Sequence, residues 1–427
     1  MKVARNQKGM ALLMLLLIFT LLASIYVLRS LDSTGINNER AEKTQKALAE
    51  AKIALLSFAS NRDFTPSGCG NNCPRPGDLP CPDTNNDGFA EVSCGNAAGT
   101  TGQANRLGRL PWRSLGIPDL RDGFGERLWY AVSSRYKNNS RFWPLNSDTA
   151  ATITLRDSAG IIVNDGSAST GLAAIVISPG PAFTRADTVA QVRSVANQNL
   201  AVNYLDNAFG EDNQNFADST VNGFISGPVR DVASNLIAND RVLAISHADM
   251  AEVMEKRVLA EVRNALTVGA YPAPASFTAV TCLGNGLINA PDCSESLGIT
   301  RGRIPANPGA AWNATSILRG ENSNNWFQLN AWREQVYYAV SSACIPLPAP
   351  PVSCLTLNNA LTVPVDGKPL VLIAAGVALA GQVRATNANK TQVINYLEGE
   401  NLMPLDDVYI RTSPLTALVN DRAISFP

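Results

Sequence analysis

Residues 8–19 read Lys8-Gly9-Met10-Ala11-Leu12-Leu13-Met14-Leu15-Leu16-Leu17-Ile18-Phe19, and no charged side chain interrupts the apolar run between Gly9 and Leu28. In a helix that rises about 1.5 Å per residue, this run covers roughly 30 Å, the thickness of a bilayer's hydrocarbon core. Basic residues, which stay on the cytoplasmic side of a membrane, precede it at Lys2, Arg5 and Lys8. The stretch therefore predicts a membrane-spanning helix, with everything after Arg29 on the outer side.

The best cleavage position lies before the apolar run, after Gly9. A cleaved secretory signal has a shorter apolar core with a small-residue cleavage site behind it, and this run is too long for that. A short basic leader, a Gly and an unbroken apolar helix resemble the class III signal of type IV pilins and type II secretion pseudopilins. The resemblance covers about the first 60 residues. The alternative is an uncleaved signal anchor.

This resemblance implies a processing site and a set of partners. A prepilin peptidase would cut after Gly9 and methylate the new N-terminus at Met10. The N-terminal helix would then contact the inner membrane and pack against other pilins or pseudopilins. Most pilins carry Glu at the fifth mature position, where this chain has Met14. In the family that carboxylate is thought to pair with a neighbouring subunit's N-terminal amine, so its absence favours a minor, tip-type subunit over the major, repeating one.

Composition places the chain among folded extracytoplasmic proteins. Its 427 residues suffice for two or three domains, and 45% of them are apolar while 17% are charged. The formal net charge of -1 gives no basic excess for nucleic acid, so no nucleic-acid partner is expected. Asn, Gly, Pro, Ser and Thr are plentiful, as expected for a loop-rich protein outside the cytoplasm.

Eight cysteines lie beyond the apolar run, and an even number in an oxidising compartment predicts disulfides. A metal site at the first three is disfavoured, because the chain has one His, His247, and the spacing is not C-x-x-C. Their clustering suggests four local pairs, which are Cys69–Cys73, Cys81–Cys94, Cys282–Cys293 and Cys344–Cys354.

One loop between these cysteines matches the first half of a calcium-binding loop. Asp83-Thr84-Asn85-Asn86-Asp87-Gly88 fits the pattern D-x-[DN]-x-[DN]-G, in which alternate oxygen-bearing side chains converge on one cation. The usual Glu at the twelfth position is replaced by Cys94, and Glu91 at the ninth stands in for it. Calcium held by Asp83, Asn85, Asp87 and Glu91 is one interpretation. The other is a turn rich in Asn, Asp and Gly that needs no ion.

A second helical stretch is predicted from Asn37 to about Ala59, after a bend at Gly35. Its apolar residues recur at steps of three and four, at Leu48, Ala51, Leu55 and Phe58, giving one stripe that can lie on a globular head. Strand signals follow at 129–133, 151–156, 160–163 and 172–178, each bounded by Gly, Pro or Asp.

Six segments of the first half recur in the same order in the second half, at offsets of roughly 200 residues. Such order indicates a tandem duplication. The matched pairs are Ala47–Leu55 with Val258–Leu266, Gly108–Pro111 with Gly302–Pro305, Arg127–Ser134 with Gln335–Ser342, Leu172–Gly180 with Lys368–Gly376, Asn203–Asp206 with Asn395–Glu398, and Asn239–Arg241 with Asn420–Arg422.

The expected fold class is α+β, because each copy places a helix before its antiparallel strands. A membrane-spanning helix would continue into an amphipathic helix, followed by two tandem pilin-like modules with disulfides. The expected divisions are a leader at 1–9, a transmembrane helix at 10–29, the spine helix with the first module at 30–246, and a second module at 247–427. Ser246 with Asp249 predicts the cap of the helix that opens the second module.

No catalytic constellation is evident. The chain contains no G-x-S-x-G, H-E-x-x-H or P-loop motif. His247 is expected to be exposed or to cap a helix. The aromatic residues Trp112, Trp129, Tyr130, Trp143, Trp312, Trp326 and Trp332 would serve either in packing or as a sugar platform.

The functional hypothesis is a non-enzymatic minor pilin or pseudopilin-like subunit that initiates, caps or decorates a type IV pilus or a type II secretion pseudopilus. The expected location is the inner membrane, with one membrane pass and the C-terminal head in the periplasm, or a surface filament. The alternatives are a filament- or membrane-anchored adhesin and, less favoured, a signal-anchored periplasmic enzyme.

Overall fold

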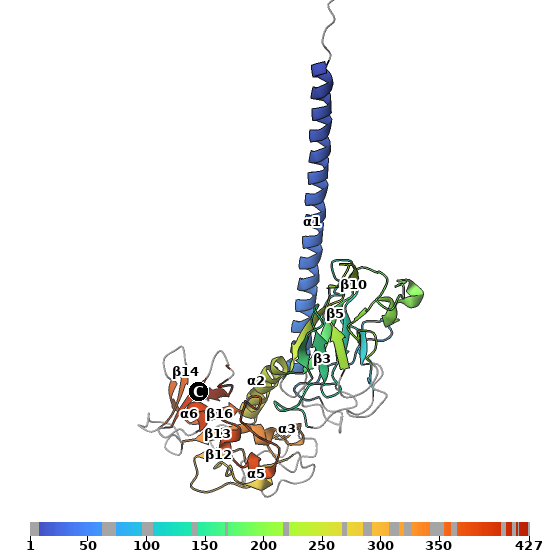
Figure 1. Cartoon of the computed structure of the whole chain (residues 1–427). Coiled ribbons are helices and arrows are strands. Elements are labelled where there is room, and N and C mark those ends of the chain that lie inside the picture. The colour runs from blue at the N-terminus through green and yellow to red at the C-terminus, as the bar shows by residue number, and fades with distance from the viewer. Residues whose placement is uncertain are drawn as a thin grey trace, which may run out of the picture.

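A computed structural model gives the fold of the chain (Figure 1). It describes residues 8–61, 74–95, 106–137, 144–166, 170–216, 222–266, 271–284, 293–306, 316–319, 326–341, 354–359, 365–402, 407–411, 416 and 418–425.

The longest element is helix α1, Lys8–Asn61, whose 54 residues extend roughly 80 Å. It runs through Gly35 without a break and projects from the head as a straight rod (Figure 1). The expected bend at Gly35 is therefore wrong. In the last turns, the predicted apolar stripe is buried at Leu48, Ala51 and Leu55. These residues hold α1 against the first sheet and against helix α2.

The expected membrane-spanning helix is contradicted. Within the described part of the chain, the apolar length that a bilayer crossing requires is not reached by any helix. The transmembrane helix at 10–29 and the single-pass inner-membrane location are therefore wrong.

The first sheet has two parts. Four strands form an antiparallel series in the order β1-β2-β5-β11, and three more form an arm in which β3 lies between β4 and β8. The arm joins the series where Ile153 pairs with Leu172. The strands are β1 (Leu107–Arg109), β2 (Trp129–Val132), β3 (Ile153–Arg156), β4 (Ile162–Asp165), β5 (Leu172–Ser178), β8 (Asn222–Ile225) and β11 (Arg241–Ser246).

The second half of the chain repeats this topology. An antiparallel series runs in the order β12-β13-β16-β18, and in a separate arm β14 lies between β15 and β17. The duplicated segments of the sequence occupy equivalent strands of the two series. The strands are β12 (Arg301–Arg303), β13 (Val336–Val340), β14 (Leu355–Asn359), β15 (Val365–Lys368), β16 (Leu370–Ala374), β17 (Val408–Arg411) and β18 (Arg422–Ser425).

The arms also correct the expected fold class. β3 pairs with β8 in parallel, and β14 pairs with β17 in parallel, so the modules are not purely antiparallel. The head is a mixture of helices with several small sheets. The remaining elements are β6 (Asn207–Ala208), β7 (Glu211–Asp212), β9 (Val229–Arg230), β10 (Leu236–Ala238), η2 (Val195–Asn197), η3 (Ala201–Asn203), η4 (Val280–Cys282), η6 (Val393–Asn395), α3 (Trp326–Leu329), α4 (Trp332–Gln335), α5 (Asn387–Lys390) and α6 (Gly399–Leu402).

The last two repeated motifs of each module are hydrogen-bonded to each other. In the first module, the backbone N–H groups of Asn239 and Asp240 donate to Oδ2 of Asp206, at 2.6 and 3.1 Å. In the second, the N–H groups of Asn420 and Asp421 donate to a carboxylate oxygen of Glu398. The carboxylate thus fixes the turn that enters the final strand, β11 or β18.

Helix α2, His247–Ala265, joins the two modules. Ser246 and Asp249 form the predicted capping box at its N-terminus. Its buried face contacts α1 and the first sheet on one side, and β16 and β18 on the other. His247 is buried, with its Nε2 atom 2.7 Å from the carbonyl oxygen of Ser147, so the expectation of an exposed His is wrong.

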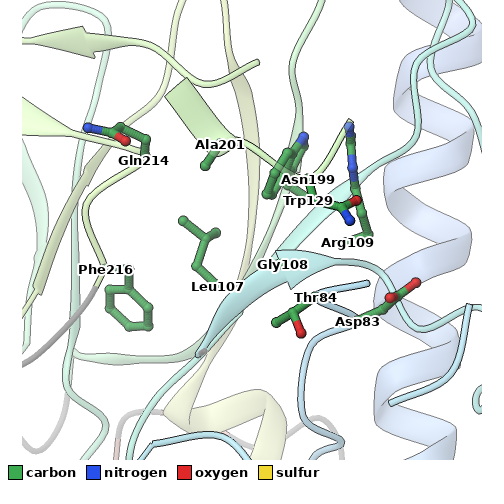
Figure 2. Close-up of a pocket in the computed structure, with 10 residues that line it drawn as sticks. All are labelled: Asp83, Thr84, Leu107, Gly108, Arg109, Trp129, Asn199, Ala201, Gln214 and Phe216. Atoms are coloured by element: carbon green, nitrogen blue, oxygen red, sulfur yellow. The ribbon is translucent and has the colours of Figure 1, made fainter. Parts of the chain in front are cut away.

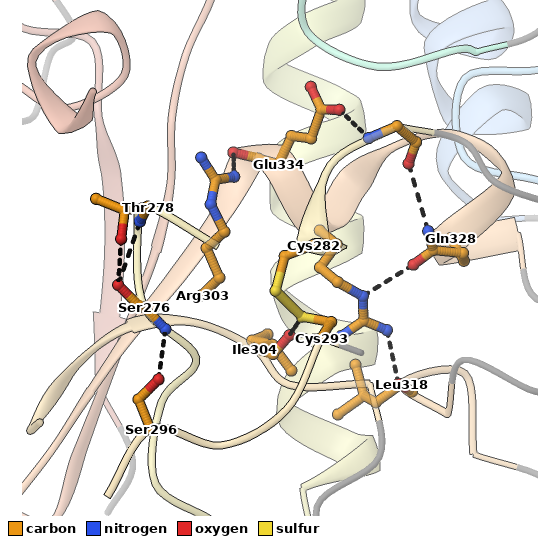
Figure 3. The surroundings of a disulfide bond; sticks show 12 residues. Ser276, Thr278, Cys282, Cys293, Ser296, Arg303, Ile304, Leu318, Gln328 and Glu334 are labelled. Atoms are coloured by element: carbon orange, nitrogen blue, oxygen red, sulfur yellow. Dashed lines mark hydrogen bonds between the residues drawn. A yellow bond between two sulfur atoms is a disulfide. The ribbon is translucent and has the colours of Figure 1, made fainter. Parts of the chain in front are cut away.

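Two of the four expected disulfides are described, Cys81–Cys94 and Cys282–Cys293. Figure 3 shows the second of them. Closing loops of this length stabilises a domain by about 3 kcal/mol in the chain-entropy model. Cys354 is also disulfide-bonded. Cys69, Cys73 and Cys344 lie outside the described residues, so the pairs Cys69–Cys73 and Cys344–Cys354 remain predictions.

The two described bridges are not equivalent positions of the duplication. Asp83 and Ala275 make the same paired backbone bonds to the first strand of their modules. Cys81 precedes Asp83, whereas Cys282 follows Ala275. The two disulfides therefore close loops at different positions in the two modules.

A buried asparagine fastens the modules together. Asn330 lies in the second module, and its Oδ1 atom accepts hydrogen bonds from Arg75 Nη1 (2.9 Å) and from the backbone N–H of Leu145 (2.8 Å). Asn146 of the first module donates to the Asn330 carbonyl oxygen at 2.8 Å. Asn330 is fully buried, so water could not take its place as the acceptor for the donors of Arg75 and Leu145.

We expect Asn330→Leu to lower the free energy of unfolding by about 2–4 kcal/mol, because two buried donors lose their acceptor. Urea denaturation of the full chain measures this loss. The control is Asn38→Leu at an exposed position of α1, for which we expect a change within about 0.5 kcal/mol. Equal stability of the two variants would contradict the fastening role.

A carboxyl group at the same junction makes stability depend on pH. Burial raises the pKa of Glu255 to about 8, although Arg422 and Ser147 oppose the shift. Ser147 Oγ donates to Glu255 Oε1 at 2.9 Å, and Arg422 Nε lies 3.5 Å from Oε2. Because the folded state binds this proton more tightly than the unfolded chain, the stabilisation is present below the unfolded pKa of about 4.5 and is lost as pH rises to about 8.

We expect Glu255→Gln to remove this dependence, since glutamine keeps an acceptor for Ser147 and carries no charge. Between pH 5 and pH 8.5 the variant should gain stability relative to the parent chain, by up to about 4 kcal/mol. Unfolding curves at both pH values measure it. Parallel pH profiles for parent and variant would exclude Glu255 as the titrating group.

Candidate functional site

The most unusual surface of the molecule is the apolar segment of α1, defined as Leu13–Leu22. Every large apolar side chain in it is between 55% and 71% exposed. Because successive helix positions point in directions about 100° apart, the whole circumference is apolar. Monomeric soluble proteins rarely expose such a large apolar surface to water, so the segment is a candidate interaction surface. Its exposed members are Leu13, Met14, Leu15, Leu16, Leu17, Ile18, Phe19, Leu21 and Leu22.

The two hydroxyl groups in and beside this segment are satisfied within the helix. Thr20 Oγ1 donates to the carbonyl oxygen of Leu17 at 3.0 Å, and Ser24 Oγ donates to that of Thr20 at 2.7 Å. These back-bonds let a polar side chain lie in apolar surroundings. The segment is therefore suited to contact with other apolar helices.

The expected processing site lies at the start of α1. Gly9 and Met10 fall within its first turn. Their side chains are outside the described residues, so cleavage after Gly9 and methylation of Met10 remain predictions. Met14 is 67% exposed and belongs to the apolar segment.

The calcium-like loop has most of its oxygen atoms committed to its own backbone. Asp83 accepts from the N–H groups of Asn86 and Gly88 through its two carboxylate oxygens, and Asn85 accepts from Asp87. Glu91 accepts from Thr84. These bonds favour the ion-free turn, whose conformation includes a positive φ at Gly88. Within the described residues, no group of three or more His, Cys, Asp or Glu side chains is arranged to hold a metal. Calcium stays a prediction.

An arginine between two aromatic rings lies beside this loop, on β1. The Arg109 guanidinium carbon is 4.1 Å from the centroid of the Trp129 ring and 4.0 Å from that of Tyr204. Its terminal nitrogens donate to the carbonyl oxygens of Arg127 (3.0 Å) and Gln198 (2.9 Å). Burial lowers the pKa of Arg109 to about 10. It remains charged at neutral pH and anchors the wall of a pocket.

This pocket has a volume of about 330 Å³ and lies between the loop, β1 and η3 (Figure 2). Such a volume falls within the range of small-ligand sites. Leu107, Trp129 and Phe216 contribute apolar surface, and Thr84, Asn199 and Gln214 contribute uncharged polar groups. The sequence singled out Asp83 and Trp129 separately but did not show that they line one pocket, because the lining residues are brought together from five separate segments.

A second pocket, of about 290 Å³, borders Arg109 on the side of Tyr204 and is lined by charged groups. Arg127 there holds Asn86 of the loop and forms an ion pair with Asp119. Arg121 also pairs with Asp119, and Glu126 pairs with Arg193, so the partners of these lining residues lie outside the lining.

The described tryptophans do not form a sugar platform. Trp129, Trp326 and Trp332 are at most 2% exposed, and Tyr130 is fully buried with its hydroxyl donating to the carbonyl oxygen of Pro80. Trp112 is half-buried. These rings pack the core. Trp143 and Trp312 lie outside the described residues.

Three comparisons with known proteins, against protein families, curated sequences and solved structures, found no match to this chain.

We expect Asp83→Ala to destabilise the chain by about 1–3 kcal/mol, because two backbone N–H groups of the turn lose their acceptor. Millimolar calcium should leave the melting temperature of the parent chain unchanged relative to a chelator, since the loop's oxygens are already used. A calcium-dependent rise that disappears in Asp83→Ala would instead establish the ion site.

Proposed function

We propose that this chain is a minor pilin or pseudopilin-like structural subunit that initiates, caps or decorates a type IV pilus or a type II secretion pseudopilus. The observation that carries the proposal is the apolar segment of α1, exposed around its whole circumference at the far end of a long helix. Apolar helices of neighbouring subunits would cover it and remove its surface from water.

The shape of the molecule supports this role. The head is confined to one end of α1, so the apolar segment is free of it and can enter a bundle of helices (Figure 1). The leader ending at Gly9 supports processing by a prepilin peptidase. Met14 supports an end position, because a subunit without a carboxylate there does not neutralise a neighbour's amine within the bundle.

The proposal predicts the state of the N-terminus in cells. Filaments sheared from the source organism should contain the chain with an N-terminal peptide that begins at methylated Met10. In a strain without prepilin peptidase, the peptide should retain Lys2–Gly9 and the chain should be missing from the filament fraction. Peptide mass spectrometry measures both.

A matched pair of variants then tests the apolar segment. Leu17→Gln keeps helix propensity but places an amide in the bundle, and the variant should be lost from filaments at normal cellular abundance. Val232→Gln, at a fully exposed position of the head, should enter them normally. Equal incorporation of the two variants, or an uncleaved leader in both strains, would refute the proposal.

A further inference from the structure

The duplication supplies an internal comparison for the pocket beside Arg109. Asp83 exchanges backbone hydrogen bonds with Arg109, and Ala275 exchanges the same pair with Arg303. The residues two positions further on are Asn85 and Phe277, and the two loops differ in sequence at this point. One module carries an exposed amide at this position and the other carries an aromatic ring.

The walls of the two sites are built alike. Arg303 lies over the rings of Tyr337 and Tyr396, at 5.2 and 5.3 Å, as Arg109 lies over Trp129 and Tyr204. Its terminal nitrogens also donate to two carbonyl oxygens, those of Glu334 (2.9 Å) and Lys390 (2.6 Å). The cation and the aromatic wall thus belong to the fold and do not by themselves distinguish the two sites.

The two sites differ in how much of the space beside the aromatic rings is occupied by side chains. In the second module, the Phe277 ring packs on Tyr337, with centroids 5.0 Å apart and planes 34° apart, and the remaining cavity is about 10 Å³. In the first module, Trp129 stands in the place of Tyr337 and the cavity is about 330 Å³. The second module therefore shows which group this framework accepts when it is occupied.

We propose that the first module's pocket binds an aromatic side chain presented by a partner polypeptide, in the place that Phe277 fills within the second module. An aromatic ring would contact Leu107 and Ala201, the partly exposed apolar side chains of the lining, and aromatic anchors of this kind dominate protein interfaces. The amides of Asn199 and Gln214 and the hydroxyl of Thr84 offer donors and acceptors to the partner's peptide groups.

The electrostatics of the site favour an uncharged occupant. Asp83 directs both carboxylate oxygens to backbone N–H groups, and Arg109 is 4% exposed with its terminal nitrogens bonded to carbonyl oxygens. The groups left facing the pocket are neutral. This inference goes beyond the proposed assembly role and does not depend on the N-terminal segment.

Binding can be tested with blocked tripeptides, N-acetyl-Gly-Phe-Gly-amide and its Leu counterpart, added to the full chain with isotope-labelled leucine methyl groups. We expect a saturable shift of the Leu107 methyl resonances with the Phe peptide and a clearly weaker response to the Leu peptide. Absence of a saturable shift, or equal responses to both peptides, would overturn the proposal.

Two blocking variants keep the test specific to this pocket. Thr84→Phe places a ring in the pocket from the side of the loop, and Ala201→Trp fills it from the side of η3. Both should abolish the Leu107 response while the chain stays folded by circular dichroism. Val232→Phe, an added ring on the open surface of the same module, should leave the response intact. Undiminished binding in both blocked variants would place the peptide elsewhere and refute the proposal.

Discussion

The head depends on the burial of two amphipathic helices against two sheets of the same topology. The last turns of α1 cover the first sheet, and α2 covers β16 and β18 of the second while it also packs on α1. Apolar burial of this kind is the main favourable term in folding, and here one core cluster extends through both modules. Because α2 serves both sheets, this cluster is shared, and each module also has a separate cluster of its own, around Trp129 in the first and around Tyr337 in the second. The polar fastening around Asn330 and the buried Glu255 lie at this shared junction.

The duplication preserved polar contacts as faithfully as apolar ones. Each module holds an arginine against two aromatic rings, and each uses one carboxylate to bond the turn before its last strand. Buried groups of this kind are costly when unpaired, so a change to one partner alone is strongly destabilising. The space beside the arginine differs between the modules: it is nearly filled in the second, where Phe277 packs on Tyr337, and open in the first.

The two ends of the molecule present different chemistry. The exposed side chains in the apolar segment of α1 are apolar, and the hydroxyl of Thr20 is already hydrogen-bonded within the helix. Such a surface suits packing against similar apolar helices. The pocket in the first module offers the side chain of Leu107 beside the amides of Asn199 and Gln214, a mixed lining that suits recognition of a specific group. An elongated rod with its recognition surface on the head is consistent with a subunit that joins an assembly at one end and contacts a partner at the other.

Features that depend on local periodicity and residue order could be predicted from the sequence. The stripe at Leu48, Ala51 and Leu55, the cap at Ser246 and the strand Leu172–Ser178 follow from spacing that each segment carries alone. The disulfides Cys81–Cys94 and Cys282–Cys293 follow from proximity along the chain. Tertiary structure alone decided the rest. The parallel pairs β3–β8 and β14–β17, the burial of His247 and the pocket at Arg109 join segments far apart in the chain, and their contacts arise only when separate surfaces meet.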